Sequence, residues 1–218
     1  MSEFSGREGT LASEGLPAWT FFRQWLKNPR AMASVSPSGR QLAHEMVAQI
    51  PPHARRVVEL GAGTGVFTRA LIEHGIAPAD LLVVELNAEL HGLLERRFPG
   101  VGVVHGDARD LRAIVARTGF ARPGEVDAVV SGLGFLAMPH DLQQAILEAV
   151  FDVLGPGRPL IQFTYAPRNP FPRSLLDRLG LEVRRAGLAW RNMPPATVYV
   201  YSRRRARPSR WPGAADTR

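Results

Sequence analysis

The sequence predicts an α/β fold with a mostly parallel sheet and helices on both faces. Short apolar runs alternate with helical patterns between about residues 55 and 165, which is the order typical of consecutive βα units. Several of these runs end in a polar residue, and the carboxyl ends of parallel strands meet at one edge of a sheet, where ligands bind. Two later strand patterns flank the turn Arg191–Pro195, which predicts an antiparallel pair closing the sheet.

The elements are expected in the following order. An amphipathic helix spans about Leu16 to Asn28, and a second helix opens with Ser36 as N-cap and Pro37 as its first residue, running to about Ile50. The parallel strands end near Glu59, Glu85, His105, Val130 and Tyr165, the intervening helices cover about 65–75, 88–98, 109–118 and 140–154, and the closing strands cover 181–190 and 197–201. The sheet is therefore expected to have seven strands.

The first strand runs into a glycine-rich turn. Glu59 is followed by Gly61, Gly63 and Gly65, a pattern that lets the backbone approach a ligand closely. The third glycine comes one position earlier than in the dinucleotide fingerprint, and Val66 stands where that fingerprint has glycine. A carboxylate beside the turn would repel a pyrophosphate but attract the ammonium and sulfonium groups of S-adenosylmethionine. We therefore predict S-adenosylmethionine as the ligand, with packing glycines alone as the alternative.

Two more acids extend this site. Glu85 ends the second strand about 20 residues further on, where an acid can accept hydrogen bonds from ribose hydroxyls. Asp107 follows the third strand, where it can accept from the amino group of adenine or cap the helix that starts near Arg109. The expected cofactor-binding residues are Glu59, Gly61, Ala62, Gly63, Glu85, Leu86, Asp107, Ala108 and Ser131.

Composition limits the class of protein. The 218 residues suffice for one α/β domain, and the absence of cysteine excludes disulfides and thiol catalysis. The first residues lack the pattern of a secretory signal, so we expect a cytoplasmic enzyme. Most of the net charge of +7 lies in the Arg-rich tail. This segment either is only solvated or binds a polyanion such as RNA or anionic lipid headgroups. We divide the chain into a disordered leader (1–15), a helical segment (16–50), a core (51–202) and a basic, disordered tail (203–218).

The first expected helix is strongly amphipathic. Its aromatic and aliphatic side chains fall on one half of a helical wheel, and its basic side chains fall on the other half. The helix packs on its own domain, lies in a membrane interface with its cations on anionic headgroups, or does both as a lid over the cofactor that also touches lipid. The residues expected to contact an anionic membrane are Trp19, Phe22, Arg23, Trp25, Leu26 and Lys27.

Several segments resemble bacterial phospholipid N-methyltransferases. They are Phe22–Pro29, Ala33–Ser38, Val129–Leu133, Gln144–Leu147 and Gln162–Pro167, and the resemblance covers about residues 21–201. It implies a Rossmann-like class I methyltransferase fold and methylation of phosphatidylethanolamine toward phosphatidylcholine by S-adenosylmethionine. It also implies a peripheral location at the inner face of the cytoplasmic membrane. Gly132 and Gly134 depart from the bulkier or stiffer residues expected from the family pattern.

The predictions for a lipid substrate rest on few residues. Arg168 is the first choice to bind the lipid phosphate and Arg40 the second, because a guanidinium can bind phosphate in a bidentate manner. Tyr165 is expected to face the methylated ammonium, and the substrate amine is expected to lose its proton to water before docking, to a carboxylate or to Tyr165. The further aromatic candidates are Trp19, Trp25 and Phe135. The histidines have no metal-ligand spacing, and we assign no metal.

Other functions remain open at this point. Adenine N6-methyltransferases of ribosomal RNA share the expected fold but carry an Asn/Asp-Pro-Pro-Tyr/Phe motif after the fourth strand. Here that place reads Ser131–Phe135 and contains neither Asn nor Pro, so we do not expect a nucleic-acid partner. A small-molecule methyltransferase would use the leader only as a lid. A non-catalytic membrane-binding protein on a decayed domain is disfavoured by the intact cofactor acids.

Overall fold

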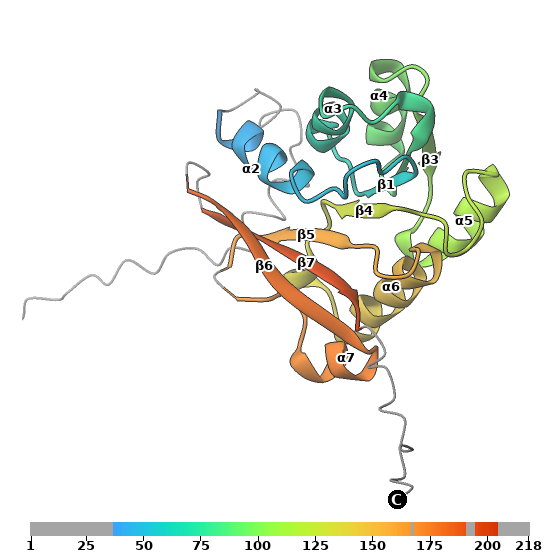
Figure 1. The fold of residues 1–218 in the computed structure, drawn as a ribbon. Helices are drawn as coiled ribbons and strands as arrows, with labels where there is room; N and C mark the ends of the chain where they lie inside the picture. The colour runs from blue at the N-terminus through green and yellow to red at the C-terminus, as the bar shows by residue number, and fades with distance from the viewer. Residues whose placement is uncertain (1–36, 167, 191–194, 205–218) are drawn as a thin grey trace, which may run out of the picture.

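The computed structural model describes residues 37–166, 168–190 and 195–204 (Figure 1). The strands are β1 (Val57–Leu60), β2 (Leu81–Glu85), β3 (Gly102–His105), β4 (Ala128–Ser131), β5 (Leu160–Thr164), β6 (Leu181–Ala189) and β7 (Ala196–Arg203). The α-helices are α2 (Pro37–Val47), α3 (Val66–Glu73), α4 (Ala88–Arg97), α5 (Leu111–Thr118), α6 (His140–Val153) and α7 (Arg173–Arg178). Short 3-10 helices are η1 (Pro78–Asp80), η2 (Ala108–Asp110) and η3 (Phe135–Ala137).

All seven strands belong to one sheet, in the order β3-β2-β1-β4-β5-β7-β6. The first five pair in parallel, and β7 runs antiparallel to both of its neighbours, β5 and β6. The strand order reverses between β1 and β4, which is where open parallel sheets form a ligand crevice at the carboxyl edge. The predicted fold class, a mostly parallel seven-stranded sheet with a closing antiparallel pair, is confirmed.

Two apolar layers enclose the sheet. Alternate residues of β1 point to opposite faces, so Val57 packs into one layer and Val58 into the other. One layer contains buried residues of α2, α3 and α4, and the other contains those of α5, α6 and α7. Fully burying a leucine such as Leu71 or Leu147 contributes about 1.5–3 kcal/mol. The two layers therefore fix the strand ends that form the site.

The structure differs from the sequence predictions at a few boundaries. Helix α2 ends at Val47, three residues before the predicted end, although Ile50 is still buried. Helix α7 was not predicted, because its six residues are too few for a helical period to be read and prolines precede it. The predicted tail began at residue 203, but Arg203 is the last residue of β7. The leader (1–15), the amphipathic helix and residues 205–218 lie outside the described residues. No helix that the structure describes is long and apolar enough to span a membrane.

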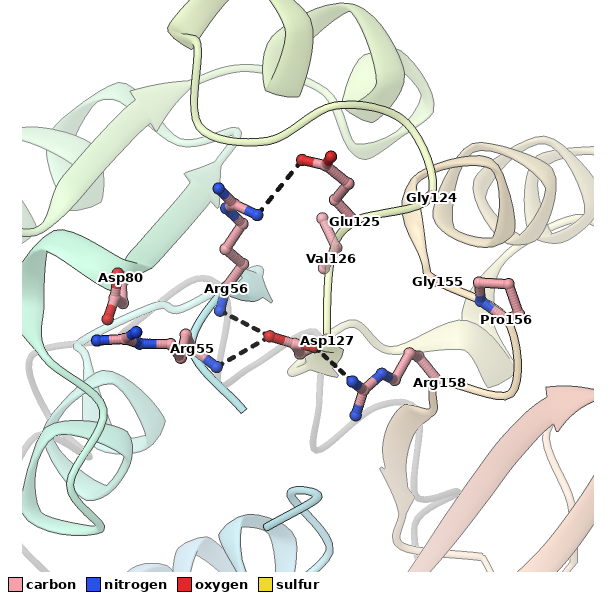
Figure 2. Close-up of a pocket in the computed structure, with 10 residues that line it drawn as sticks. All are labelled: Arg55, Arg56, Asp80, Gly124, Glu125, Val126, Asp127, Gly155, Pro156 and Arg158. Carbon is pink, nitrogen blue, oxygen red and sulfur yellow. Dashed lines mark hydrogen bonds and ion pairs between the residues drawn. The ribbon is translucent and has the colours of Figure 1, made fainter. Parts of the chain in front are cut away.

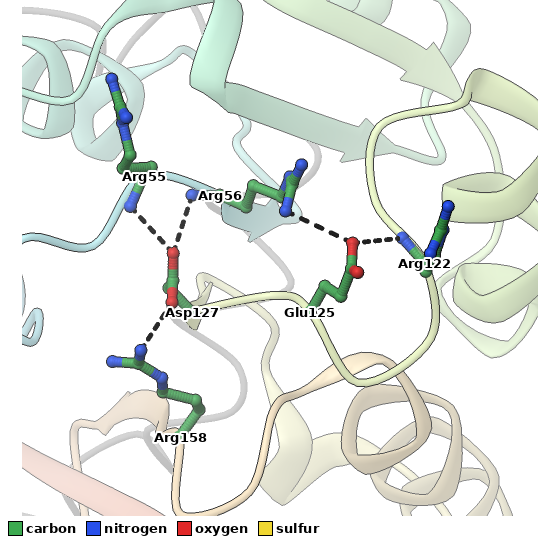
Figure 3. Close-up of polar contacts among 6 residues, drawn as sticks. All are labelled: Arg55, Arg56, Arg122, Glu125, Asp127 and Arg158. Carbon is green, nitrogen blue, oxygen red and sulfur yellow. Dashed lines mark hydrogen bonds and ion pairs between the residues drawn. The ribbon is translucent and has the colours of Figure 1, made fainter.

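A charged network closes the amino edge of the sheet, opposite the carboxyl ends of the strands (Figures 2 and 3). Asp127 accepts the backbone N–H groups of Arg55 and Arg56 at 2.9 and 3.1 Å and pairs with Arg158 at 3.0 Å. Glu125 pairs with Arg56 at 3.3 Å and accepts the N–H of Arg122 at 3.2 Å. The network borders a cavity of about 650 Å³ and ties the starts of β1, β4 and β5 together.

Candidate active site

The turn after β1 is held in a conformation that only glycine adopts easily. Gly61, Gly63 and Gly65 have φ angles of +68°, +58° and +82°, in the left-handed region. A Cβ on Gly61 would lie 2.6 Å from Cδ2 of Leu133, and one on Gly65 would lie 2.3 Å from the ring of Phe98. The turn therefore needs glycine both for its backbone angles and for its close packing.

Glu85 lies directly against this turn. Its Oε2 accepts the backbone N–H of Gly63 at 2.9 Å, and its Oε1 accepts the N–H of Asn87 at 2.9 Å. Each carboxylate oxygen can accept more than one hydrogen bond, so Glu85 retains acceptor capacity at the edge of the sheet. The next residue, Leu86, is 66% exposed. The structure thus brings together the two motifs that the sequence linked only by spacing.

Glu59 lies below the turn and is fully buried. Thr68 donates its hydroxyl to Oε2 of Glu59 at 2.6 Å, while Oε1 has no hydrogen-bond partner among the described residues. Burial raises the pKa of Glu59 to about 8. The carboxyl is therefore largely protonated at neutral pH in the free protein, and a nearby cation would restore its charge. An unpaired buried oxygen in this place fits a ligand that carries an ammonium group.

Asp107 caps the short helix η2. Its Oδ1 accepts the backbone N–H of Arg109 at 2.9 Å, and its Oδ2 pairs with the Arg109 guanidinium at 2.8 Å. The side-chain hydrogen bond from Arg109 lowers the pKa of Asp107. Of the two roles that the sequence left open, the capping role is confirmed. A contact between Asp107 or its half-buried neighbour Ala108 and adenine stays a prediction.

The segment after β4 packs directly on the glycine turn. Ser131 is fully buried, and its Oγ accepts the N–H of Leu133 at 3.2 Å. Gly132 donates its N–H to the carbonyl oxygen of Leu60 at 2.8 Å, and a Cβ on Gly132 would lie 2.5 Å from the carbonyl oxygen of Gly61. This contact explains why glycine stands at position 132, where the family resemblance suggested a bulkier residue.

Two buried glutamines hold the same segment, and the sequence analysis missed both. Gln162 on β5 donates its side-chain amide to the carbonyl oxygens of Leu133 and Phe163 at 2.9 and 2.6 Å. Gln143 on α6 donates to those of Phe135 and Met138 at 2.8 and 3.2 Å. A glutamine inside an apolar strand was the available signal, because buried polar side chains are normally hydrogen-bonded.

The predicted substrate residues reach the same edge of the sheet but are spread over it. Tyr165 follows β5, is half-buried and meets the ring of Phe163 edge-on at 5.3 Å. Arg168 is exposed a few residues later. Arg40 is exposed in the first turn of α2, which lies at the carboxyl edge because the end of α2 leads to the start of β1. The prediction for Phe135 was wrong, since its ring is 1% exposed and packs in the core.

No group of three His, Asp or Glu in the described ranges is placed to hold a metal ion. The acids of the site instead surround a turn of the backbone. This arrangement suits an organic ligand with hydroxyl and ammonium groups.

Comparison with known proteins shows the family of this chain. A family model described as a methyltransferase domain matches residues 57–157. An ornithine lipid N-methyltransferase of Singulisphaera acidiphila is 34% identical over 185 residues, which cover 82% of this chain and 92% of that protein. The chain belongs to the class I S-adenosylmethionine-dependent methyltransferases. S-adenosylmethionine is therefore its methyl donor, as the sequence predicted.

Two further methyltransferases are similar to this chain, one in sequence and one in fold. The ribosomal RNA small subunit methyltransferase A of Methylococcus capsulatus is 38% identical over 114 residues, 50% of this chain but only 38% of that protein. A crystal structure of the Burkholderia thailandensis 1,6-didemethyltoxoflavin-N1-methyltransferase with bound S-adenosylhomocysteine superposes with a TM-score of 0.58. It is 14% identical and covers 85% of this chain and 87% of that one, which establishes the shared fold.

Proposed function

We propose that this methyltransferase methylates the amine of a membrane lipid, with phosphatidylethanolamine as its substrate and phosphatidylcholine as the end of the series. The observation that carries the proposal is the extent of similarity to the ornithine lipid enzyme, which reaches over 92% of that protein. Phosphatidylethanolamine and ornithine both present a primary amine a few bonds from an anion. The shared requirement is therefore a lipid ammonium held beside a phosphate or a carboxylate.

The acids around the glycine turn bind the donor in this proposal. When bound, S-adenosylmethionine supplies an electrophilic methyl group on a sulfonium sulfur. Glu85 accepts hydrogen bonds from the ribose hydroxyls through its spare lone pairs, and Gly61 and Gly63 allow close approach of the backbone. Glu59 offers its unpaired Oε1 to the ammonium group. The remaining residues that we expect to contact the donor are Ala62, Leu86, Asp107, Ala108 and Ser131.

The substrate residues act mainly by positioning. Methyl transfer is an in-line displacement, so alignment of the amine with the methyl group is the main task of the protein. Arg168, assisted by Arg40, binds the anionic group of the lipid through its exposed guanidinium. Tyr165 presents its ring to the substrate nitrogen as positive charge develops there. The amine must first lose a proton, because an alkyl amine of this kind has a pKa near 10.4.

We further propose that the enzyme works peripherally at the inner face of the cytoplasmic membrane. The amphipathic leader, which the sequence predicts for residues 16–28, supports this location. Its aromatic half suits the headgroup region of a bilayer, and its cations suit anionic lipids.

Ribosomal RNA is the second candidate substrate, because half of the chain matches a ribosomal RNA enzyme. Against it, the segment after β4 reads Ser131-Gly132-Leu133 and has neither the polar amide nor the proline that hold a target adenine. We therefore expect no transfer to RNA.

The deciding experiment measures transfer of a labelled methyl group from S-adenosylmethionine. The acceptors are vesicles containing phosphatidylethanolamine, vesicles containing ornithine lipid, and small-subunit ribosomal RNA. We expect label in phosphatidylethanolamine and its loss in Glu85→Gln, with exposed Glu148→Gln as the control. Label in ornithine lipid alone would support methylation of a lipid amine, with ornithine lipid in place of phosphatidylethanolamine as the substrate. Label in RNA, or in neither lipid, would overturn the proposed function.

A further inference from the structure

The carboxyl edge of the sheet carries exposed apolar side chains outside the cofactor site. Trp190 is 72% exposed, more than any other large apolar residue that the structure describes. It directly follows β6, which runs in the same direction as β5 because both are antiparallel to β7. Leu136, 37% exposed in η3, follows β4 at the same edge. Both side chains therefore lie at the carboxyl edge of the sheet, which we call the mouth of the site because the glycine turn and Glu85 lie at this edge.

Unpaired positive charge lies at the same edge. Arg168 follows β5 and Arg40 lies in the first turn of α2, which packs against β6. Both are exposed, and neither has an ion-pair partner among the described residues. At the opposite edge, the guanidinium groups of Arg56 and Arg158 pair with acids, whereas Arg55 and Arg122 join the network only through their backbone N–H groups (Figure 3). Free cations and exposed apolar groups thus occur together at the mouth.

We propose that Arg40, Leu136, Arg168 and Trp190 form a docking rim that seats the mouth of the active site on an anionic phospholipid bilayer. Tryptophan suits the headgroup region because its ring is apolar and its N–H finds polar partners. The arginines extend their stems over apolar groups and reach lipid phosphates. The rim gives the molecule one orientation, with the amino-edge network facing away from the membrane. The inference rests on the proposed lipid substrate and adds a contact surface separate from the leader.

The absence of cysteine allows a direct test of this orientation. An environment-sensitive fluorophore is attached to a single cysteine in the full chain, at Trp190→Cys or Leu136→Cys. The matched control is Val183→Cys, which lies in β6, the strand that Trp190 follows, is 40% exposed and sits near the amino edge. On vesicles of equal parts phosphatidylglycerol and phosphatidylcholine, we expect a blue shift at 190 and 136 but not at 183. Equal responses at all three positions would overturn the rim.

A binding measurement provides the second arm. Trp190→Ala should lower partition into the same vesicles by about tenfold, because a large apolar contact is lost, while Val183→Ala should not. Unchanged cofactor affinity in both variants shows that they are folded. Equal partition of the two variants would contradict the rim. Displacement of the chain from vesicles by RNA, without a blue shift of the fluorophore at position 190, would contradict it as well. Vesicle docking without lipid methylation would instead refute the proposed substrate and leave the rim standing.

Discussion

The backbone N–H of Gly63 donates a hydrogen bond to Oε2 of Glu85 at 2.9 Å, across 22 residues of sequence. The bond fixes the acid of β2 against the turn that follows β1. It orients the carboxylate before any donor arrives, because the other oxygen is held by Asn87. The glycine turn and Glu85 are therefore coupled, and a substitution in either should alter the geometry of the other.

Replacing Glu85 by Gln should weaken S-adenosylmethionine binding by about 10- to 100-fold. An amide keeps the shape but loses a charged acceptor, and hydrogen bonds to charged groups are worth about 1.5–3 kcal/mol. Isothermal titration calorimetry measures the affinity, with exposed Glu148→Gln as the matched carboxylate control. An affinity within twofold of the unmodified protein would show that Glu85 does not contact the donor.

The titration of Glu59 should make the free energy of unfolding depend on pH. Its pKa rises from 4.5 to about 8 on folding, so between these values the folded state binds more protons than the unfolded state. The free energy of unfolding should then fall as pH rises through this window, by up to about 1.4 kcal/mol per pH unit. Urea unfolding from pH 5 to pH 9 measures the slope. Glu59→Gln should remove this contribution, and an identical slope in the variant would exclude Glu59 as its source.

Donor binding should release a proton from the same residue. A cationic ligand beside the unpaired Oε1 of Glu59 favours the charged carboxylate and lowers its pKa. Calorimetry at pH 7 in two buffers of different ionisation enthalpy counts the protons released. We expect a release of up to about one proton that is absent in Glu59→Gln. The same count in both proteins would mean that the ammonium group binds elsewhere.

Gln162→Leu should destabilise the segment after β4. The carbonyl oxygens of Leu133 and Phe163 would lose their donor, and leaving a buried acceptor unpaired costs about 1–3 kcal/mol. Urea unfolding measures the loss. Gln144→Leu is the control, because the side-chain amide of Gln144 bonds only groups at the surface. Equal stability of the two variants would mean that Gln162 does not anchor the segment.

Gly132→Ala should weaken donor binding about tenfold or more, equivalent to at least about 1.4 kcal/mol. Its Cβ would lie 2.5 Å from the carbonyl oxygen of Gly61, so the glycine turn must shift to relieve the overlap. Gly39→Ala is the control: outside the backbone of α2, no atom of the described residues lies within 4 Å of its Cβ position, and alanine favours a helix by about 0.5–1 kcal/mol. An unchanged donor affinity in Gly132→Ala would show that the glycine turn can shift without affecting donor binding.

The sequence allowed prediction of the strands and of the acids at their ends, because strand period and glycine spacing are local signals. The βα pattern predicted that Glu85 lies at the same edge of the sheet as the glycine turn, whereas its hydrogen bond to Gly63 is a finding of the structure. The anchors Gln143 and Gln162 were missed, since hydrogen bonds to carbonyl oxygens distant in sequence leave no local pattern. Phe135 was misplaced for a similar reason: an aromatic near a strand end can turn toward the site or, as here, into the core beside Phe171.

The contact of Leu133 and Gly132 with Gly61 has a consequence for how this enzyme can diversify. In the proposed site, the segment that would meet the acceptor packs against the turn that would hold the donor. Selection for a new headgroup through residues 132–133 should therefore also lower the affinity for the donor. Evolution toward other acceptors should therefore proceed through the stretch that follows β5 and through the N-terminal segment. Directed libraries aimed at altered lipid preference are best confined to those two regions.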